Sequence, residues 1–227
     1  MTTSALIFAG GTGSRMNTKT LPKQFLELHG KPIIIHTIEH FEDHPAVSDI
    51  VVVCVDGWLD YCRDLLARFN IKKVSQVVPG VLREKYKNDD DYVLIHDGVR
   101  PLIDGGIISK NIEAAKKYGA AITVKPVIET VIQVDEADVI NQVIERSTCQ
   151  TAVAPQTFAL SKIHSLHLKA QAENQFDMTD SATLARYFGL PLHTVMGGSE
   201  NIKITTPSDF YIFRAIYEAR ENAQIFG

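Results

Sequence analysis

The chain has 227 residues, of which 45% are hydrophobic and 22% charged, and its 23 Lys and Arg against 27 Asp and Glu give a formal net charge of −4. At about 150 residues per domain, this length predicts one domain with at most a small appendage, large enough to bury a core without disulfides or metals. The composition argues against disordered, collagen-like and coiled-coil proteins. The acidic balance argues against a nucleic-acid-coating protein, but it is compatible with a local basic pocket for a phosphorylated ligand.

The cysteines and the apolar runs bear on the cellular compartment. Cys54, Cys62 and Cys149 show no CxxC or CxxH spacing, so the sequence predicts neither a disulfide framework nor a zinc site. Reduced thiols are typical of a cytoplasmic protein. No apolar run approaches the ~18 residues of a membrane span. The N-terminus lacks a basic region before its apolar stretch and predicts a first strand rather than a signal peptide. We therefore expect a cytoplasmic protein with neither membrane nor nucleic acid as a partner.

Short apolar runs recur along the chain and predict strands. They are continuous rather than alternating, which is typical of parallel strands covered on both faces. The predicted strands are Ala5–Ala9, Ile50–Val55, Val74–Val78, Tyr92–Ile95, Ala120–Val124 and Leu192–Val195.

Amphipathic stretches between these runs predict helices. Pro32 stands at a helix start, and Gly119 and Gly189 stand where helices commonly end. The predicted helices are Ile33–Phe41, Trp58–Phe69, Ile107–Tyr118, Asp180–Phe188 and Ser208–Ala223. The alternation of strands and helices predicts an α/β fold with a doubly wound, mostly parallel, Rossmann-like sheet. We expect residues 1–227 to form one domain.

One stretch, Val127–Val143, interrupts this alternation. It is rich in β-branched residues and is broken by the acidic run Asp135–Asp138. This pattern predicts a hairpin or arm added to the main sheet.

A glycine-rich turn, Phe8–Met16 (FAGGTGSRM), follows the first predicted strand. The backbone N–H groups of such a turn can approach a polyphosphate closely. Its spacing matches neither the dinucleotide fingerprint, because Met16 stands where a third small residue is needed, nor the Walker A loop, because no Lys-Ser/Thr follows the last glycine. Arg15 and Lys23 flank the turn and suit a triphosphate, although each cation could instead be a solvated surface charge.

Two further segments carry candidate site residues. Asp97 ends a predicted strand in HDGVRP, where a carboxylate can hold Mg²⁺ together with phosphate oxygens and water; the alternative is that Asp97 caps a turn. We assign no chemistry to His96. Lys203 lies in a short alternating segment before the last helix, which on its own predicts an ordinary strand with a solvated lysine.

Together these segments resemble the cytidylyltransferases that act on sugar-alcohol phosphates. The resemblance covers nearly the whole chain, in order and spacing, through the motifs GGTGSRM, LPKQF, HDGVRP, APQTF, MTD and NIKITT. The family has branches for ribitol phosphate and for methylerythritol phosphate. LPKQFLEL, Val99 in HDGVRP and Thr157 in PQTF look closer to the ribitol branch, and the methylerythritol branch stays the alternative.

The resemblance implies a nucleotidyltransferase-type sheet and a reaction of CTP with an alditol phosphate, assisted by Mg²⁺, that gives a CDP-alditol and pyrophosphate. The implied catalytic residues, which bind the triphosphate and stabilise the pentacoordinate α-phosphorus, are Arg15, Lys23 and Lys203. The implied nucleotide-binding residues are Ala9, Gly10, Gly11, Thr12, Gly13, Ser14, Gly80 and Asp97, with Asp97 also at the metal. The implied acceptor-binding residues are Arg100, Thr130, Arg146, Thr179 and Glu200.

The resemblance also implies a homodimer in which residues 127–143 form a dimerisation arm, and Arg100 and Thr130 reach the site of the partner subunit. The chemistry agrees with the residue types. The nucleophile is a phosphate oxygen that is already ionised at neutral pH, so positioning and charge stabilisation suffice without a nucleophilic Ser or Cys.

The chain departs from the family after Val78. Relatives continue with a glycine pair, contacts to the cytosine and a full helix, whereas here Pro79-Gly80 passes directly to Val81–Lys87. We hypothesise that a segment is missing from the printed sequence between Gly80 and Val81; a true deletion would instead affect selectivity for CTP.

Two other classes of protein compete with the transferase. A nicotinamide-dependent oxidoreductase is disfavoured by the absent third glycine and by the lack of an acidic residue after a clear second strand. A nucleotide-binding regulatory module is disfavoured by the set of Arg15, Lys23, Asp97 and Lys203.

Overall fold

The structure, a computed structural model, describes residues 2–11, 21–79 and 91–226. Several predicted site residues lie outside the described residues, as does the Gly80–Val81 junction. They are Thr12, Gly13, Ser14, Arg15 and Gly80.

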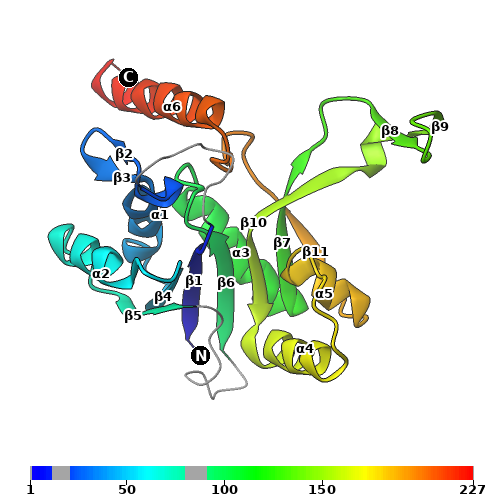
Figure 1. The fold of residues 1–227 in the computed structure, drawn as a ribbon, viewed down its shortest axis with the longest axis horizontal. Coiled ribbons are helices and arrows are strands. Elements are labelled where there is room, and N and C mark those ends of the chain that lie inside the picture. Colours follow the sequence, from blue (N-terminus) through cyan, green and yellow to red (C-terminus); the bar gives the residue numbers. More distant parts are fainter. Residues whose placement is uncertain (1, 12–20, 80–90, 227) are drawn as a thin grey trace.

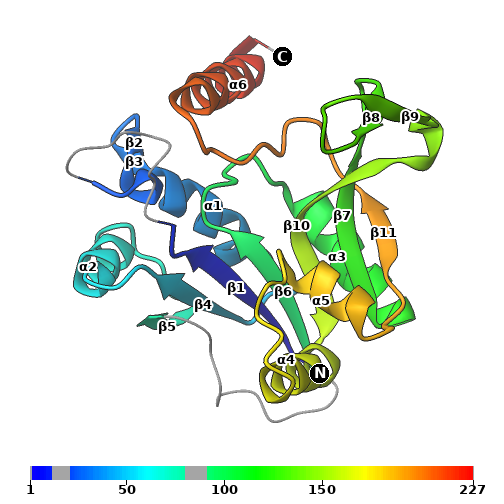
Figure 2. The same cartoon turned by 45° about the vertical axis from the view of Figure 1, so that its right-hand side comes forward.

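Seven strands form the central sheet, in the order β11-β7-β10-β6-β1-β4-β5 (Figures 1 and 2). Strand β1 pairs in parallel with β4 and β6, β4 with β5, and β7 with β11, whereas β10 is antiparallel to both of its neighbours. The strands are β1 (Thr3–Ala9), β4 (Asp49–Cys54), β5 (Val74–Pro79), β6 (Tyr92–Asp97), β7 (Ala120–Pro126), β10 (Gln150–Ala159) and β11 (His193–Met196). The predicted mostly parallel α/β sheet is confirmed.

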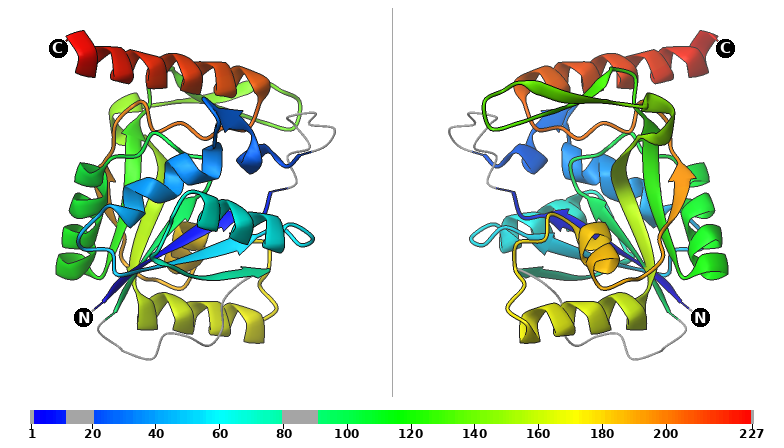
Figure 3. Two further views of the ribbon diagram at one scale, coloured as in Figure 1. Left: turned by 90° about the vertical axis from the view of Figure 1, so that its left-hand side faces the viewer. Right: turned by 90° about the vertical axis from the view of Figure 1, so that its right-hand side faces the viewer.

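Helices cover both faces of this sheet (Figure 3). One face packs against the first three helices in a core that includes Ile7 and Leu94, and the other packs against α4 and α5 in a core that includes Val93 and Phe158. Helix α6 lies across α1, where Phe213 joins Ile33 in a third cluster. The helices are α1 (Ile33–Glu42), α2 (Leu59–Arg68), α3 (Gly105–Tyr118), α4 (Leu160–Ala172), α5 (Ser181–Tyr187) and α6 (Pro207–Phe226).

Strand β10 and helix α4 were not predicted from the sequence. The strand contains Pro155 after a cis peptide bond with Ala154, and its pairing with β7 shifts register between Ala152 and Gln156. Because proline cannot donate to a ladder, it normally argues against an internal strand. Here the irregular register accommodates Pro155 in an internal strand, near the carboxyl ends of the neighbouring parallel strands, where the candidate site lies.

The stretch that interrupts the alternation forms strands β8 (Val131–Val134) and β9 (Ile140–Ile144), which pair antiparallel in a separate two-stranded sheet. Figure 1 shows this hairpin extending away from the seven-stranded sheet. Its apolar side chains are largely exposed, with Val143 at 65% and Ile140 at 56%. Its role as a dimerisation arm stays a prediction.

Within the described ranges, no helix has the length and apolar character needed to cross a membrane.

Candidate active site

The carboxyl ends of β1 and β6 lie side by side. Phe8 pairs with Asp97, and the Gly98 amide donates to the Phe8 carbonyl at 2.8 Å. A Cβ at position 98 would lie 3.1 Å from that oxygen and 3.3 Å from Ile7 Cγ2, so only glycine allows the two chain segments to approach this closely without a shift. The start of the glycine-rich turn, Ala9–Gly11, therefore leaves the sheet next to the Asp97 carboxylate.

Asp97 is paired with two cations. Its Oδ2 accepts from Arg100 Nε at 2.7 Å, and its Oδ1 accepts from Lys203 Nζ at 2.8 Å. Burial alone would raise the pKa of this carboxyl, but Arg100 and Lys203 outweigh burial and lower the pKa below its usual value. Asp97 is therefore an anion at neutral pH, and its side chain pairs with cations rather than capping a turn.

Lys23 lies beside the glycine-rich turn because the two residues after it are anchored. Gln24, 1% exposed, donates through Nε2 to the Ala9 carbonyl at 2.6 Å, and Phe25 is fully buried with its ring 5.6 Å from that of Trp58. Lys23 Cε lies 3.6 Å from the position that a Cβ on Gly11 would take. The short 3-10 turn Lys23–Phe25 thus holds the lysine stem against the end of β1.

Lys203 is carried by an extended segment, residues 197–206, which we call the Lys203 strap. No strand is assigned over residues 201–205, so the predicted strand is wrong here. The strap begins with the Gly197 amide donating to Val124 at 2.8 Å. A Cβ on Gly197 would lie only 2.7 Å from Thr123 Cγ2, so the strap lies directly on the end of β7.

The middle of the Lys203 strap is fixed by a buried amide. Asn201, 3% exposed, donates through Nδ2 to the Ala154 carbonyl at 2.7 Å and accepts at its own carbonyl from Arg100 Nη1 at 3.0 Å. Further along, the Ile204 amide donates to Val99 at 2.9 Å. Lys203 is therefore held between two anchored residues, and its Nζ reaches Asp97.

Two predicted acceptor residues, Arg100 and Glu200, form ion pairs within the chain. Arg100 is 9% exposed, and its guanidinium bonds to Asp97 and Asn201 within this chain; its reach toward a partner subunit stays a prediction. Glu200 accepts from Arg220 of α6 at 2.5 Å. Its carboxylate joins the strap to the last helix, a contact that depends on tertiary packing and that the motif alone cannot indicate.

The other three predicted acceptor residues, Thr130, Arg146 and Thr179, are exposed. Arg146 Nη1 donates to the Ile128 carbonyl at 2.7 Å, which places it with Thr130 at the base of the hairpin, and Thr179 precedes α5. Across the described ranges, no hydrogen bond or ion pair joins these three to Asp97 or Lys203.

Sequence reasoning missed Gln24 and Asn201 as site residues. Each is a buried carboxamide one or two positions from a predicted catalytic lysine, and each has a side-chain oxygen without a hydrogen-bond partner. The available signal was a carboxamide directly before a large apolar residue, Gln24 before Phe25 in LPKQF and Asn201 before Ile202 in NIKITT.

The donor set for a metal is small. Among the described residues, no group of three or more His, Cys, Asp or Glu side chains is placed to hold a metal ion. Asp97 supplies one ionised carboxylate at the strand ends, and Mg²⁺ commonly takes one or two protein carboxylates and completes its shell with phosphate oxygens and water. Asp97 therefore fits Mg²⁺ as a single protein ligand beside a bound polyphosphate.

A mostly parallel sheet whose strand ends carry a glycine-rich turn, an ionised carboxylate and lysines from two separate segments is typical of α/β enzymes that bind phosphorylated nucleotides. Residues 3–219 match the protein family described as 2-C-methyl-D-erythritol 4-phosphate cytidylyltransferase (IspD). The chain belongs to this family and is a CTP-dependent cytidylyltransferase. This result favours the transferase hypothesis over the oxidoreductase and the regulatory module considered from the sequence.

Curated relatives with two different activities in their names are similar to this chain over nearly their whole length. A ribitol-5-phosphate cytidylyltransferase of Vibrio parahaemolyticus is 48% identical over 235 residues, covering 98% of this chain and 99% of the relative. A 2-C-methyl-D-erythritol 4-phosphate cytidylyltransferase of Geotalea uraniireducens is 36% identical, covering 96% and 98%. The 235-residue alignment exceeds the 227 residues of this chain, so the Vibrio relative has residues that this chain lacks.

Solved structures agree with the fold. The 4-diphosphocytidyl-2C-methyl-D-erythritol synthase of Anaerococcus prevotii has a TM-score of 0.82 at 26% identity, covering 96% of each chain. The 2-C-methyl-D-erythritol 4-phosphate cytidylyltransferase of Francisella tularensis has a TM-score of 0.77 at 26% identity, covering 96% of this chain and 99% of the other.

Proposed function

We propose that the protein transfers CMP from CTP to D-ribitol 5-phosphate, giving CDP-ribitol and pyrophosphate. The observation that carries the choice of acceptor is the higher identity, 48% against 36%, to relatives named for ribitol 5-phosphate. 2-C-methyl-D-erythritol 4-phosphate is the alternative acceptor, because the family description names it.

In the proposed reaction, an ionised oxygen of the acceptor phosphate attacks the α-phosphorus of CTP, and pyrophosphate leaves. Negative charge grows on the phosphoryl oxygens in the transition state, where preorganised cations stabilise it more than they stabilise the ground state. Lys203, aimed by its 2.8 Å bond to Asp97, and Lys23, beside Gly11, supply that charge with Arg15. Mg²⁺ held by Asp97 would neutralise phosphate oxygens.

The remaining residues divide between the two substrates. In this proposal the backbone of residues 9–14 and Gly80 bind the nucleotide, and Thr130, Arg146 and Thr179 bind the acceptor. Arg100 and Glu200 are also proposed at the acceptor, and their bonds to Asn201 and Arg220 hold the Lys203 strap. We propose a cytoplasmic homodimer in which the β8–β9 hairpin contacts the second subunit, since its exposed apolar side chains would be covered there.

Pyrophosphate release tests the proposed function. Full-length protein is incubated with CTP and a magnesium salt, and with either D-ribitol 5-phosphate or 2-C-methyl-D-erythritol 4-phosphate. We expect kcat/KM to be at least about 100-fold higher with ribitol 5-phosphate, a difference of about 2.7 kcal/mol, with CDP-ribitol identified by mass. Preference for 2-C-methyl-D-erythritol 4-phosphate would make that compound the acceptor. No pyrophosphate release with either compound would refute the proposed function.

A further inference from the structure

We propose that Lys125 binds the phosphate group of the acceptor, as a cation additional to those already placed at the site. This inference rests on the proposed cytidylyltransferase function and names a residue that selects the acceptor within the same site.

Lys125 is the penultimate residue of β7 (Ala120–Pro126). It lies at the carboxyl end of its strand, as Asp97 does in β6. The two strands are separated only by β10, which runs antiparallel between them. Since β7 and β6 run in the same direction, their carboxyl ends meet at one edge. Lys125 is therefore on the same rim as the Asp97–Lys203 pair.

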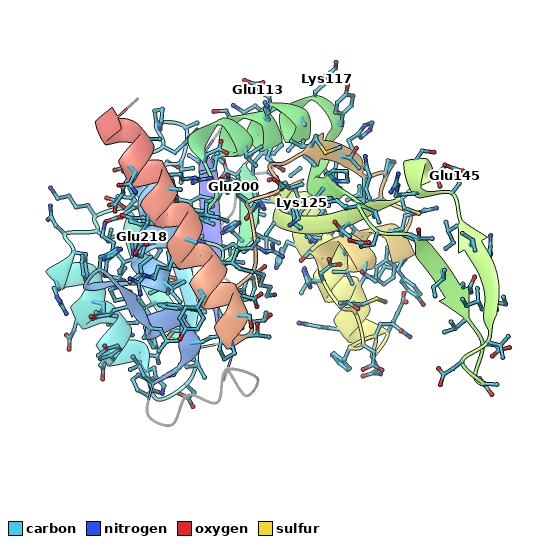
Figure 4. The ribbon with its side chains drawn as sticks, turned by 90° about the horizontal axis from the view of Figure 1, so that it is seen from above. Glu113, Lys117, Lys125, Glu145, Glu200 and Glu218 are labelled. Carbon is cyan, nitrogen blue, oxygen red and sulfur yellow. The ribbon has the colours of Figure 1, made fainter. Side chains whose placement is uncertain are left out.

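The Lys203 strap links Lys125 to that pair. Lys125 Nζ lies 3.4 Å from the Ser199 carbonyl, at the long limit for a hydrogen bond. Two residues further, the Asn201 carbonyl accepts from Arg100, which in turn bonds to Asp97. In the view of Figure 4, Lys125 lies between Glu200 of the strap and Glu145 at the base of the hairpin.

The charges around this rim do not balance. Arg100 and Lys203 share the single carboxylate of Asp97, and among the described residues no carboxylate forms an ion pair with Lys125. Burial first, and then repulsion from Arg100, lower the pKa of Lys125. A cation kept near another cation with only a long bond to a carbonyl is placed to receive an anion.

The position of Lys125 favours the acceptor phosphate over the triphosphate. Three strand spacings, about 14 Å, separate β7 from β1, whose end carries Gly11 and Lys23. In the opposite direction, the chain runs from Lys125 into residues 126–130, and Arg146 bonds to Ile128 within that segment. Lys125 thus lies on the side of the Asp97–Lys203 pair that faces away from Gly11 and Lys23, on the chain segment that leads to Thr130.

Three variants separate charge from tethering. Lys125→Met removes both the charge and the donor, Lys125→Gln keeps a donor for the Ser199 carbonyl without the charge, and Lys125→Arg keeps the charge. Lys117→Met, an exposed lysine on α3, is the matched control. The KM for D-ribitol 5-phosphate, the KM for CTP and kcat are measured for each variant, together with Tm.

We expect the KM for D-ribitol 5-phosphate to rise roughly 10- to 100-fold in Lys125→Met and Lys125→Gln, as for loss of a charge-assisted hydrogen bond. The KM for CTP should stay within about twofold, and Lys125→Arg should recover most of the affinity.

Three results would overturn the proposal. A rise in the KM for CTP instead would place Lys125 at the triphosphate. A loss of kcat that Lys125→Gln rescues would reduce Lys125 to a tether of the strap. Unchanged constants would remove Lys125 from the site. Inactive wild-type protein would refute the proposed function itself, a result distinct from these three.

Discussion

Lys203 Nζ lies 2.8 Å from Asp97 Oδ1, although the two residues are 106 positions apart in the chain. The bond joins the end of β6 to the Lys203 strap, and Arg100 completes a three-residue charge group. Because Lys203 is 43% exposed at its side chain, the pair contributes little to folding stability. Its consequence is instead that one lysine is aimed at the strand ends where a nucleotide would bind.

We therefore predict that the two lysines contribute to turnover and not to stability. Lys203→Met and Lys23→Ala should each lower kcat by about 10²–10³-fold, the loss typical of removing one charge-stabilising group. Their Tm values should stay close to that of the parent protein, with Lys117→Met as the control. Near-normal turnover in either variant, checked by pyrophosphate release, would remove that lysine from its proposed role.

A second prediction concerns the start of the Lys203 strap. In Gly197→Ala, the new methyl group would lie 2.7 Å from Thr123 Cγ2, so the strap must shift away from β7. We expect kcat to fall about 10-fold or more, because small displacements of a positioning group are costly in catalysis.

A second-site change provides the control. Thr123→Ser removes Cγ2 but keeps the hydroxyl, which donates to Pro155 at 2.7 Å and accepts from Asn111 at 2.9 Å. The double variant should recover most of the lost kcat. If Thr123→Ser does not restore activity, steric displacement of the strap is not the cause of the loss.

A third prediction separates two roles for Glu200. Since its carboxylate is paired with Arg220, we expect Glu200→Gln to leave the KM for D-ribitol 5-phosphate within about twofold and to lower the free energy of unfolding by less than about 1 kcal/mol. Arg220→Gln should behave in the same way. A tenfold rise in the acceptor KM for Glu200→Gln alone would return Glu200 to the acceptor site.

These residues show what the sequence could and could not predict. Continuous apolar runs indicated the parallel strands because such strands are buried on both faces, and Gly119 marked the end of α3 because it adopts a positive φ of 89° there. Strand β10 was missed because it contains Pro155, and a proline argues against an internal strand. The partners of Arg100 and Glu200 depend on how the strap and α6 pack against HDGVRP, and local pattern carries no information about contacts over such sequence separations.

The last prediction follows from two buried histidines. Burial lowers the pKa of His36 and of His96 to about 4, whereas the unfolded chain binds a proton near 6.5. Between these values the unfolded state holds more protons than the native state, so stability is full above about pH 6.5 and declines as the pH falls toward 4. Carboxylates such as Asp97, whose pKa is lowered, keep their stabilising contribution through this range and lose it only at lower pH.

Urea unfolding at about pH 7 and pH 5 measures this effect, which should reach at most about 2 kcal/mol for each histidine. His36→Phe keeps an aromatic ring against Phe213 and Tyr217, which lie 5.5 and 5.0 Å away between ring centroids. It should therefore lose less stability on acidification than the parent protein. The exposed His164→Ala should behave as the parent does. An equal loss in His36→Phe and the parent would show that His36 does not cause the pH dependence.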